Sequence, residues 1–215
     1  MSKENSAKEN KSTASKRRKQ TWFDVCLKAG DRFMKNKMWR DAIEAYSALE
    51  RVLPGNTYIY DMRGLCFLNN GMPEEAVEDL SASIRIDPTN PDTYNKRGAG
   101  YSMLGMHREA LLDYNEAIIL NPDEARFYAN RGLCCLELDD ACQAVANFDK
   151  AISLDVKNEL DALHLYRGEA HSCLGNYKLA LEDFDRELEL HPLNMNAFAS
   201  RMLVLGMMDN DKANS

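Results

Sequence analysis

The sequence predicts an all-α fold, an α-solenoid built from antiparallel helix pairs. Five glycines recur along the chain at an interval of thirty-four positions, which widens to thirty-six before the last one, and a period of this length is typical of stacked helix pairs. These glycines are Gly30, Gly64, Gly98, Gly132 and Gly168. Because successive repeats bury their faces against each other, the chain is expected to form one elongated domain with a continuous core.

A second observation is that small and large side chains alternate within each period. An alanine stands twelve positions after each glycine, and a large side chain stands four positions after that alanine. The large residues are Tyr46, Leu80, Tyr114, Phe148 and Phe184. Small residues let two helix backbones approach closely, while the large one is expected to fill the space between neighbouring pairs.

A third observation is proline at the end of four of the five periods. Pro54, Pro88, Pro122 and Pro192 follow their glycines by twenty-four positions, and Val156 breaks the column. Because proline has no backbone donor and restricts the residue before it, each second helix should stop there. Second helices are therefore expected at 39–52, 73–86, 107–120, 141–154 and 177–190. Each should follow a first helix that runs from about seven residues before the glycine to six after it.

These columns resemble the tetratricopeptide repeat over about 23–194. Aromatic residues flank the glycines as well: Tyr60, Tyr94 and Tyr128 before them, and Phe33, Phe67 and Tyr101 after them. The resemblance implies a right-handed superhelix with repeats at about 23–56, 57–90, 91–124, 125–160 and 161–194. It also implies a concave face lined by the first helices, which serves for protein–protein interaction.

The segments outside the repeats differ in character. Residues 1–21 contain seven Lys or Arg, two Glu and no apolar run, so we expect a disordered basic tail rather than a signal peptide or membrane span. Residues 195–208 repeat the first-helix pattern without a partner helix and are expected to cap a repeat domain over 22–208 with a wettable outer face. A cut-off repeat and a docking surface remain alternatives for this helix. Residues 209–215 are expected to be flexible.

Charged residues also recur at the repeat spacing. An arginine precedes four of the glycines and returns as Arg201, and Asp or Asn stands fifteen positions after the same four glycines. The first repeat lacks both, with Ala29 and Ala45 in their places. Since an unpaired cation near a helix interface is costly, the two columns are expected to bond to each other, within a repeat or between repeats.

The sequence offers no catalytic or metal-binding constellation. No HExxH, GxSxG, Walker A or GxGxxG element is present, and the six cysteines lack CxxC spacing. His164 and His171 occupy aromatic columns, so they are interpreted as core residues rather than ligands. We therefore expect a protein that is not an enzyme and has no cofactor, no metal site and no catalytic residues.

The free positions of the first helices predict a groove for a partner. Apolar side chains supply a floor there and scattered polar side chains supply further contacts, which suits a peptide or helix of a protein, or part of a multi-protein complex. The predicted groove residues are Leu27, Asp31, Met34, Tyr58, Asp61, Leu65, Leu68, Asn95, Lys96, Arg126, Asn130, Leu133, Leu136, Leu165, Tyr166 and Glu169. The net charge outside the tail is −12, which argues against nucleic acid in the groove.

The resemblance also raises alternatives. Many proteins of this type bind the acidic C-termini of Hsp70 or Hsp90, but acidic and apolar residues stand at the positions of that two-carboxylate clamp. A co-chaperone or assembly chaperone without the clamp remains an alternative. Another assigns the work to the tail residues Lys16, Arg17, Arg18 and Lys19, as a nuclear import signal or a contact with RNA or a tubulin tail. The cytoplasm, or the nucleus through this tail, is the expected location, and the sequence leaves the oligomeric state open.

Overall fold

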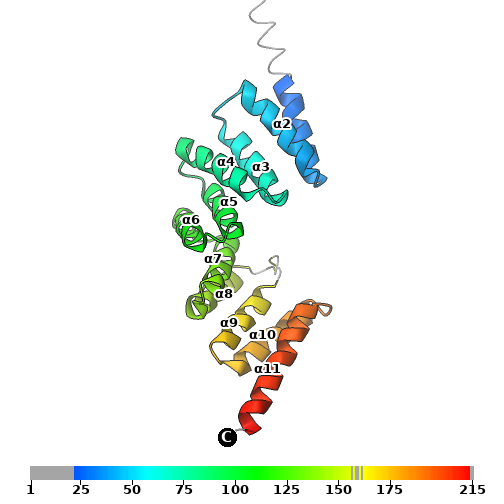
Figure 1. Ribbon diagram of the computed structural model, residues 1–215, viewed down its shortest axis with the longest axis vertical. Coiled ribbons are helices and arrows are strands. Elements are labelled where there is room, and N and C mark those ends of the chain that lie inside the picture. Colours follow the sequence, from blue (N-terminus) through cyan, green and yellow to red (C-terminus); the bar gives the residue numbers. More distant parts are fainter. Residues whose placement is uncertain (1–21, 156, 158–159, 161, 214–215) are drawn as a thin grey trace, which may run out of the picture. The chain divides into compact units, whose positions relative to one another are not determined.

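A computed structural model describes residues 22–155, 157, 160 and 162–213. Within this part of the chain the regular structure is entirely helical (Figure 1). The chain divides into two compact units, Met1–Thr89 and Asn90–Ser215. The all-α architecture expected from the repeat spacing is confirmed.

The first unit contains two helix pairs. A helix over residues 22–35 is followed by α2 (Trp39–Val52), and α3 (Thr57–Asn69) is followed by α4 (Pro73–Ile86). Asn56 caps the start of α3 by accepting a hydrogen bond from the Ile59 amide, and Pro73 begins α4, where its missing donor is harmless. α3 packs against both α2 and α4.

The second unit contains three helix pairs and a final helix. The pairs are α5 (Pro91–Met103) with α6 (His107–Leu120), α7 (Ala125–Glu137) with α8 (Ala141–Leu154), and α9 (Leu163–Cys173) with α10 (Tyr177–Leu190). Each helix packs against the next, and the first helices α5, α7 and α9 also touch in sequence. All five second helices of the chain, α2 included, have the predicted bounds.

The last helix is longer than expected. α11 runs Met195–Ala213, whereas the sequence predicted a helix over 195–208 followed by a flexible end. No proline follows Met195, and Gly206 has an open environment inside the helix, so nothing in the local sequence stops it at 208. α11 packs on α10 and touches α9 (Figure 1).

Every helix pair turns through one residue with positive φ. This residue lies seven positions after the repeat glycine and is glycine in three repeats, with φ from 72° to 74° at Gly71, Gly105 and Gly175. Lys37 and Asp139 take the same left-handed conformation in the other two. The tight turn needs this conformation to reverse the chain, and glycine adopts it without strain.

The repeat glycines allow the two helices of a pair to approach closely. A Cβ built on Gly98 would lie 2.7 Å from a ring carbon of Tyr114, and one on Gly168 would lie 2.6 Å from Phe184. Both distances are shorter than real contacts allow. The large column residue therefore packs against the glycine of its own repeat, which the sequence pattern alone did not specify.

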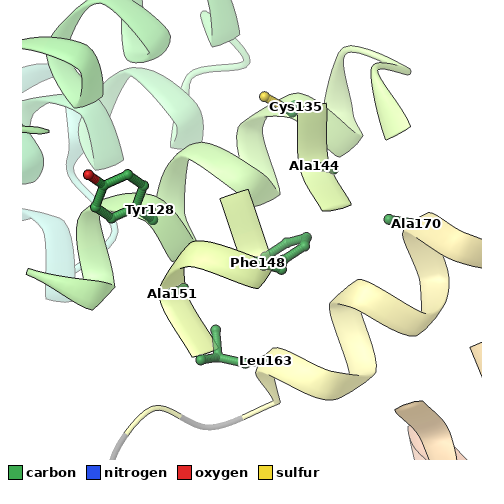
Figure 2. Packing of buried hydrophobic residues seen from close by; sticks show 7 residues of the cluster. All are labelled: Tyr128, Cys135, Ala144, Phe148, Ala151, Leu163 and Ala170. Carbon is green, nitrogen blue, oxygen red and sulfur yellow. The ribbon is translucent and has the colours of Figure 1, made fainter. Parts of the chain in front are cut away.

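The same large side chains also join one repeat to the next. Phe148 on α8 is fully buried and shares a cluster with Leu163 and Ala170 of α9 (Figure 2). Its ring stacks on that of Tyr166, with centroids 6.1 Å apart. The expectation that these residues fill the space between neighbouring pairs is thus confirmed at Phe148.

The arginine column pairs both within a repeat and backward to the preceding one. Arg63 and Arg97 each make two hydrogen bonds of 2.6–2.8 Å to the aspartate 16 residues later, Asp79 or Asp113. Arg131 and Arg167 make the same link to Asn147 and Asp183. Their second branch reaches back to Asn115 and Asp149 on the preceding second helix. The two alternatives left open by the sequence are therefore both realised.

Aromatic side chains cover the arginines. The Arg97 guanidinium lies 5.8 Å from the ring centroid of Tyr94 and 5.7 Å from that of Tyr101. In the last repeat His164 stands where Tyr94 stands in the third, and its Nδ1 lies 3.3 Å from Asp183. The interpretation of His164 as a satisfied core residue is confirmed. The Nδ1 atom of His171 is also buried but has no hydrogen-bond partner.

Candidate functional site

The first unit has an apolar hollow on the face formed by its first helices. The hollow measures about 360 Å³ and is lined by Asp31, Met34, Lys35, Trp39, Tyr58, Met62 and Leu65. These residues come from the helix over 22–35, the start of α2, and α3. The floor is thioether, indole and aliphatic carbon, whereas the two charged side chains are exposed and oppositely charged.

Asp31 is held in place at this hollow by two tyrosines. The Tyr46 hydroxyl donates a 2.7 Å hydrogen bond to Asp31 Oδ1, and the Tyr58 hydroxyl donates one of 3.0 Å to the same oxygen. Burial raises the pKa of both phenols, and the hydrogen bond to Asp31 raises it further. Both tyrosines therefore stay protonated as donors, and the Asp31 side chain has a fixed orientation beside the apolar floor.

A larger hollow lies in the second unit, on the face shared by α5, α7 and α9. It measures about 630 Å³. Its lining residues are Ala99, Ser102, Met103, Gly105, His107, Tyr114, Asn130, Leu133, Cys134, Glu137 and Tyr166. The size is sufficient for several side chains of a guest segment.

Burial keeps two titratable groups of the second hollow, Cys134 and Tyr114, protonated. Burial raises the pKa of the Cys134 thiol to about 11, and its Sγ donates to the carbonyl oxygen of His107 at 3.0 Å. Burial likewise raises the pKa of Tyr114 to about 12, and its hydroxyl lies 3.2 Å from that of Ser102. A neutral thiol is a poor nucleophile. The buried Cys134 is therefore a small packing residue.

Comparison with known proteins identifies the family. The profile of the tetratricopeptide repeat matches residues 27–91 and 104–159, together more than half of the chain. The chain belongs to the tetratricopeptide-repeat family. Family and fold together support a protein-interaction scaffold, and this family typically provides non-catalytic adaptors.

One curated relative matches part of this tetratricopeptide-repeat chain. It is the peptidyl-prolyl cis-trans isomerase FKBP4 of Bos taurus, 39% identical over 66 residues. That alignment covers 31% of this chain and 14% of the relative. The match therefore concerns a small part of the isomerase.

Solved structures share the tetratricopeptide-repeat fold. MamA has a TM-score of 0.68 and 24% identity over 78% of this chain and 91% of its own. PilF of Pseudomonas aeruginosa has a TM-score of 0.75 and 17% identity, over 90% and 87%. YrrB, titled a TPR protein with an unusual peptide-binding site, has a TM-score of 0.67 and 18% identity, over 80% and 88%. At these identities the likeness establishes the fold alone.

The two tetratricopeptide-repeat hollows include seven of the sixteen predicted groove residues. The first hollow contains Asp31, Met34, Tyr58 and Leu65, and the second contains Asn130, Leu133 and Tyr166. The other predicted residues lie elsewhere. Leu27, Leu68, Lys96, Leu136 and Glu169 are half-buried outside both hollows.

Some predicted groove residues are not accessible. Leu165 is 4% exposed and packs with Phe184 and Val204, so its assignment to an open groove is wrong. Asp61 and Asn95 are also buried. Each lies three residues before a repeat glycine, as Leu165 does, so this position is covered within the fold in three repeats.

Two polar groove predictions are already engaged within the second unit. Asn130 Nδ2 donates to Asn95 Oδ1 at 2.8 Å, which links α7 to α5. Arg126 is exposed and forms ion pairs with Asp92 at 2.7 Å and with Glu124 at 3.1 Å. Any guest segment would meet these side chains as paired groups.

The sequence reasoning missed a further position on the same face. Lys35, Met103 and Glu137 each lie five residues after a repeat glycine and line a hollow. This position was left out because the face was assigned to the positions six, three and two before each glycine and one and four after it. The start of the second helix was missed as well, at Trp39 and His107. The periodicity could have identified Lys35, Met103 and Glu137, because the same position after the glycine lines a hollow in three repeats.

Among the residues that the structure describes, no three His, Cys, Asp or Glu side chains gather closely enough to hold a metal ion. None of the helices described is both long and apolar enough to cross a membrane. The tail residues Lys16, Arg17, Arg18 and Lys19 lie outside the described residues.

Proposed function

We propose that this tetratricopeptide-repeat chain is a non-catalytic adaptor that holds a peptide or helix of a partner protein on its first-helix face. The observation that carries the proposal is the pair of hollows with apolar side chains at their surface. Tyr58 and Met103 line them while 44% and 53% exposed. Exposed apolar surface in a concave site, framed by polar groups, is typical of recognition sites.

The chemistry of the first hollow favours a segment with an apolar anchor. Met34, Met62, Leu65 and Trp39 offer polarizable and aliphatic contacts, and methionine adapts to guests of different shape. Asp31 and Lys35 stand at the edge with opposite charges. A guest that carries one charged residue of either sign beside its anchor would therefore find a complementary partner.

Burial that keeps ionisable groups protonated supports binding over chemistry at three of the side chains concerned. Tyr114 and Cys134 line the second hollow, and Tyr46 donates a hydrogen bond to Asp31 at the first. Burial raises the pKa of all three groups. YrrB, whose title names a peptide-binding site, shares the fold and supports peptides as the guest class. Residence in the cytoplasm or nucleus is part of this proposal.

The test is a paired substitution at the two hollows. Leu65→Glu with Leu133→Glu should abolish partner capture by crosslinking and mass spectrometry, because a carboxylate cannot occupy an apolar anchor site without losing its hydration. The matched control is Ile86→Glu with Ile119→Glu, at residues 51% and 71% exposed that line neither hollow. Circular dichroism and melting should stay close to those of the wild type. Retention of every partner by the folded double variant contradicts the proposal.

A photo-crosslinking residue gives a second measurement that does not depend on introducing charge. Placed at Tyr58 or Met103, it should trap the partner that the wild type captures. Placed at Ile119, it should trap none of it. Equal trapping at all three positions would count against the first-helix face.

The basic tail supplies the competing explanation. If residues 1–20 held the partner, their deletion would remove capture, and capture by the intact chain would fall steeply with salt. The adaptor proposal instead expects the shortened chain to capture the same partners. Measuring both variants at two salt concentrations separates these outcomes.

A further inference from the structure

The last helix, α11, has one face buried in the fold. Ala197 and Val204 lie seven residues apart and are 0% and 1% exposed. They pack with Phe184 and partly buried residues of α10, and Met208 joins the same cluster. Asn194 caps the helix by accepting from the Asn196 and Ala197 amides, and Arg201 binds Asp185 of α10. α11 is therefore firmly seated in the second unit.

The opposite face of α11 is apolar and exposed. Along the sequence, its residues are separated alternately by three positions and by one, which is the spacing of a single stripe on a helix. They are Met195, Phe198, Ala199, Met202, Leu203 and Gly206, all exposed. Met195 is 71% exposed and Leu203 61%. The wettable outer face expected of a capping helix is not what the structure has, so the stripe requires another explanation.

A cut-off repeat does not account for this stripe. Met202 stands in the glycine column, where the five repeats have no side chain because the large column residue of the same repeat packs directly on the backbone. A Cβ at those glycines would lie 2.6 to 2.9 Å from that residue. A methionine at this position therefore excludes a second helix packed as in the other repeats.

We propose that the exposed stripe of α11 binds the same stripe of a second copy of this chain, with the two helices antiparallel about a twofold axis at Met202. Phe198 and Gly206 lie four residues before and after Met202. The axis therefore sets Phe198 of each copy against Gly206 of the other. Gly206 has open space around it, with nothing within 4 Å of a built Cβ. At both ends of the contact, the Phe198 ring of one copy therefore meets the space left by the missing side chain of Gly206 in the other. This makes the surface self-complementary.

Charge favours the same orientation. Asp209 lies seven residues after Met202, and Met195 lies seven residues before it. In the antiparallel pair each Asp209 therefore approaches the N-terminal end of the other α11, where the helix dipole favours a negative charge. A parallel pair would instead bring the two Asp209 carboxylates together. The helix ends thus select one direction of pairing.

The size of the stripe sets the expected strength. One helix face buries less than the roughly 800 Å² per partner of a standard stable interface, so the dimer should be weak, with a dissociation constant on the order of micromolar. Analytical ultracentrifugation of the full chain from about 1 to 200 μM covers this range. We expect a monomer–dimer equilibrium. A monomer throughout, or a ladder of larger head-to-tail species, overturns the proposal.

Substitutions test the stripe itself. Met202→Glu with Leu203→Glu should give a monomer at every concentration, while the control Ile119→Glu on α6 should dimerise like the wild type. Both target residues are exposed, so the fold should be retained, as circular dichroism would verify. Gly206→Leu fills the gap opposite Phe198 and should weaken association at least about tenfold without changing the monomer. Unaltered dimerisation of the glutamate variant contradicts the proposal.

Engineered cysteines test the direction of pairing. The background carries Cys142→Ser and Cys173→Ser, which removes the exposed thiols. In it Met202→Cys should form a disulfide-linked dimer under mild oxidation, because residue 202 meets its own copy at the axis. Met195→Cys should not, since the two copies of residue 195 would lie about 20 Å apart along antiparallel helices. Crosslinking at both positions indicates a parallel pair and overturns the proposed geometry.

Discussion

The first repeat and the third link their two helices through different polar groups. In the third, Arg97 of α5 binds Asp113 of α6 through two hydrogen bonds and lies between two tyrosine rings. The first repeat has Ala29 and Ala45 at those positions. Its two helices are linked instead by the Tyr46 hydroxyl, which donates to Asp31 at the edge of the first hollow.

The link in the third repeat is purely structural, whereas the link in the first repeat lies at the candidate binding surface. Arg97, Arg131 and Arg167 line neither hollow, so their hydrogen bonds join helices away from the proposed guest site. Asp31 lines the hollow and is itself the acceptor of the link. A guest that contacts Asp31 would therefore contact the same group that joins the two helices of the first repeat.

The largest expected effect is at the buried ion pair. Arg97→Ala leaves Asp113, 3% exposed, without its main partner and should lower the free energy of unfolding by about 3–5 kcal/mol. Arg131→Ala should cost less, about 1–3 kcal/mol, because its partners Asn147 and Asn115 are neutral. Urea unfolding followed by circular dichroism gives both values. The double variant Arg97→Ala with Asp113→Ala should recover part of the loss. Equal losses of unfolding free energy for Arg97→Ala and Arg131→Ala would contradict the distinction between a charged and a neutral partner.

The glycine column comes next. Gly168→Ala places a methyl group 2.6 Å from the buried Phe184 ring and should destabilise the chain by about 1–3 kcal/mol. Gly206→Ala meets nothing within 4 Å, and alanine favours helix, so it should be neutral or stabilise by up to about 1 kcal/mol. Thermal melts of the two variants measure the contrast. Similar melting temperatures would mean that helix propensity, rather than close packing, explains the repeat glycines.

A smaller effect is expected at the first repeat. Tyr46→Phe removes the donor to Asp31 and should cost about 1 kcal/mol, because the carboxylate is exposed enough for water to replace the hydroxyl. Tyr114→Phe loses only a 3.2 Å contact with the Ser102 hydroxyl and should cost about 0.5 kcal/mol. Urea midpoints of the two variants provide the comparison. A loss of about 3 kcal/mol or more for Tyr46→Phe would place the first-repeat link on a level with the buried ion pairs.

The smallest effect is the acid dependence of the last repeat. Burial raises the pKa of Asp183, but hydrogen bonds from His164 and Arg167 outweigh this and bring it below its usual value. Because the folded pKa is lowered, the stabilisation is present above the ordinary aspartate pKa of about 4 and is lost as the pH falls through the lower folded value. Asp183→Asn should therefore flatten the acid limb of stability against pH, whereas exposed Asp123→Asn should not. An unchanged acid limb in Asp183→Asn would contradict this assignment.

Much of the fold follows from local rules. The bounds of α4, α6 and α10 could be predicted because proline, glycine and the apolar columns each act on a few neighbouring residues. The position of α9 could not be fixed as well: it begins at Leu163, after a left-handed Ala162, rather than at 161. The two-residue insertion of the fourth repeat has no counterpart in the other repeats, so the periodicity carries no information there.

The candidate site was predicted less completely. Leu133 and Tyr166 line the second hollow as expected, whereas Leu165 is in the core. Adjacent positions on one helix differ by about 100° in direction, so a face assigned from spacing is uncertain at its edges. Accessibility at those edges depends on the neighbouring helix, which spacing on a single helix does not describe.

The sequence by itself determined the repeat, the helices and the columns that meet at the core, because each depends on residues close together along the chain or at one fixed period. Only the tertiary structure decided three things: that the arginines bond within their repeats and, at Arg63, Arg131 and Arg167, also backward, that the large side chains rest on the glycines of their own repeat, and that the outer face of α11 is exposed. These are relations between surfaces brought together by packing. They depend on distance and direction in space, which a one-dimensional pattern does not contain.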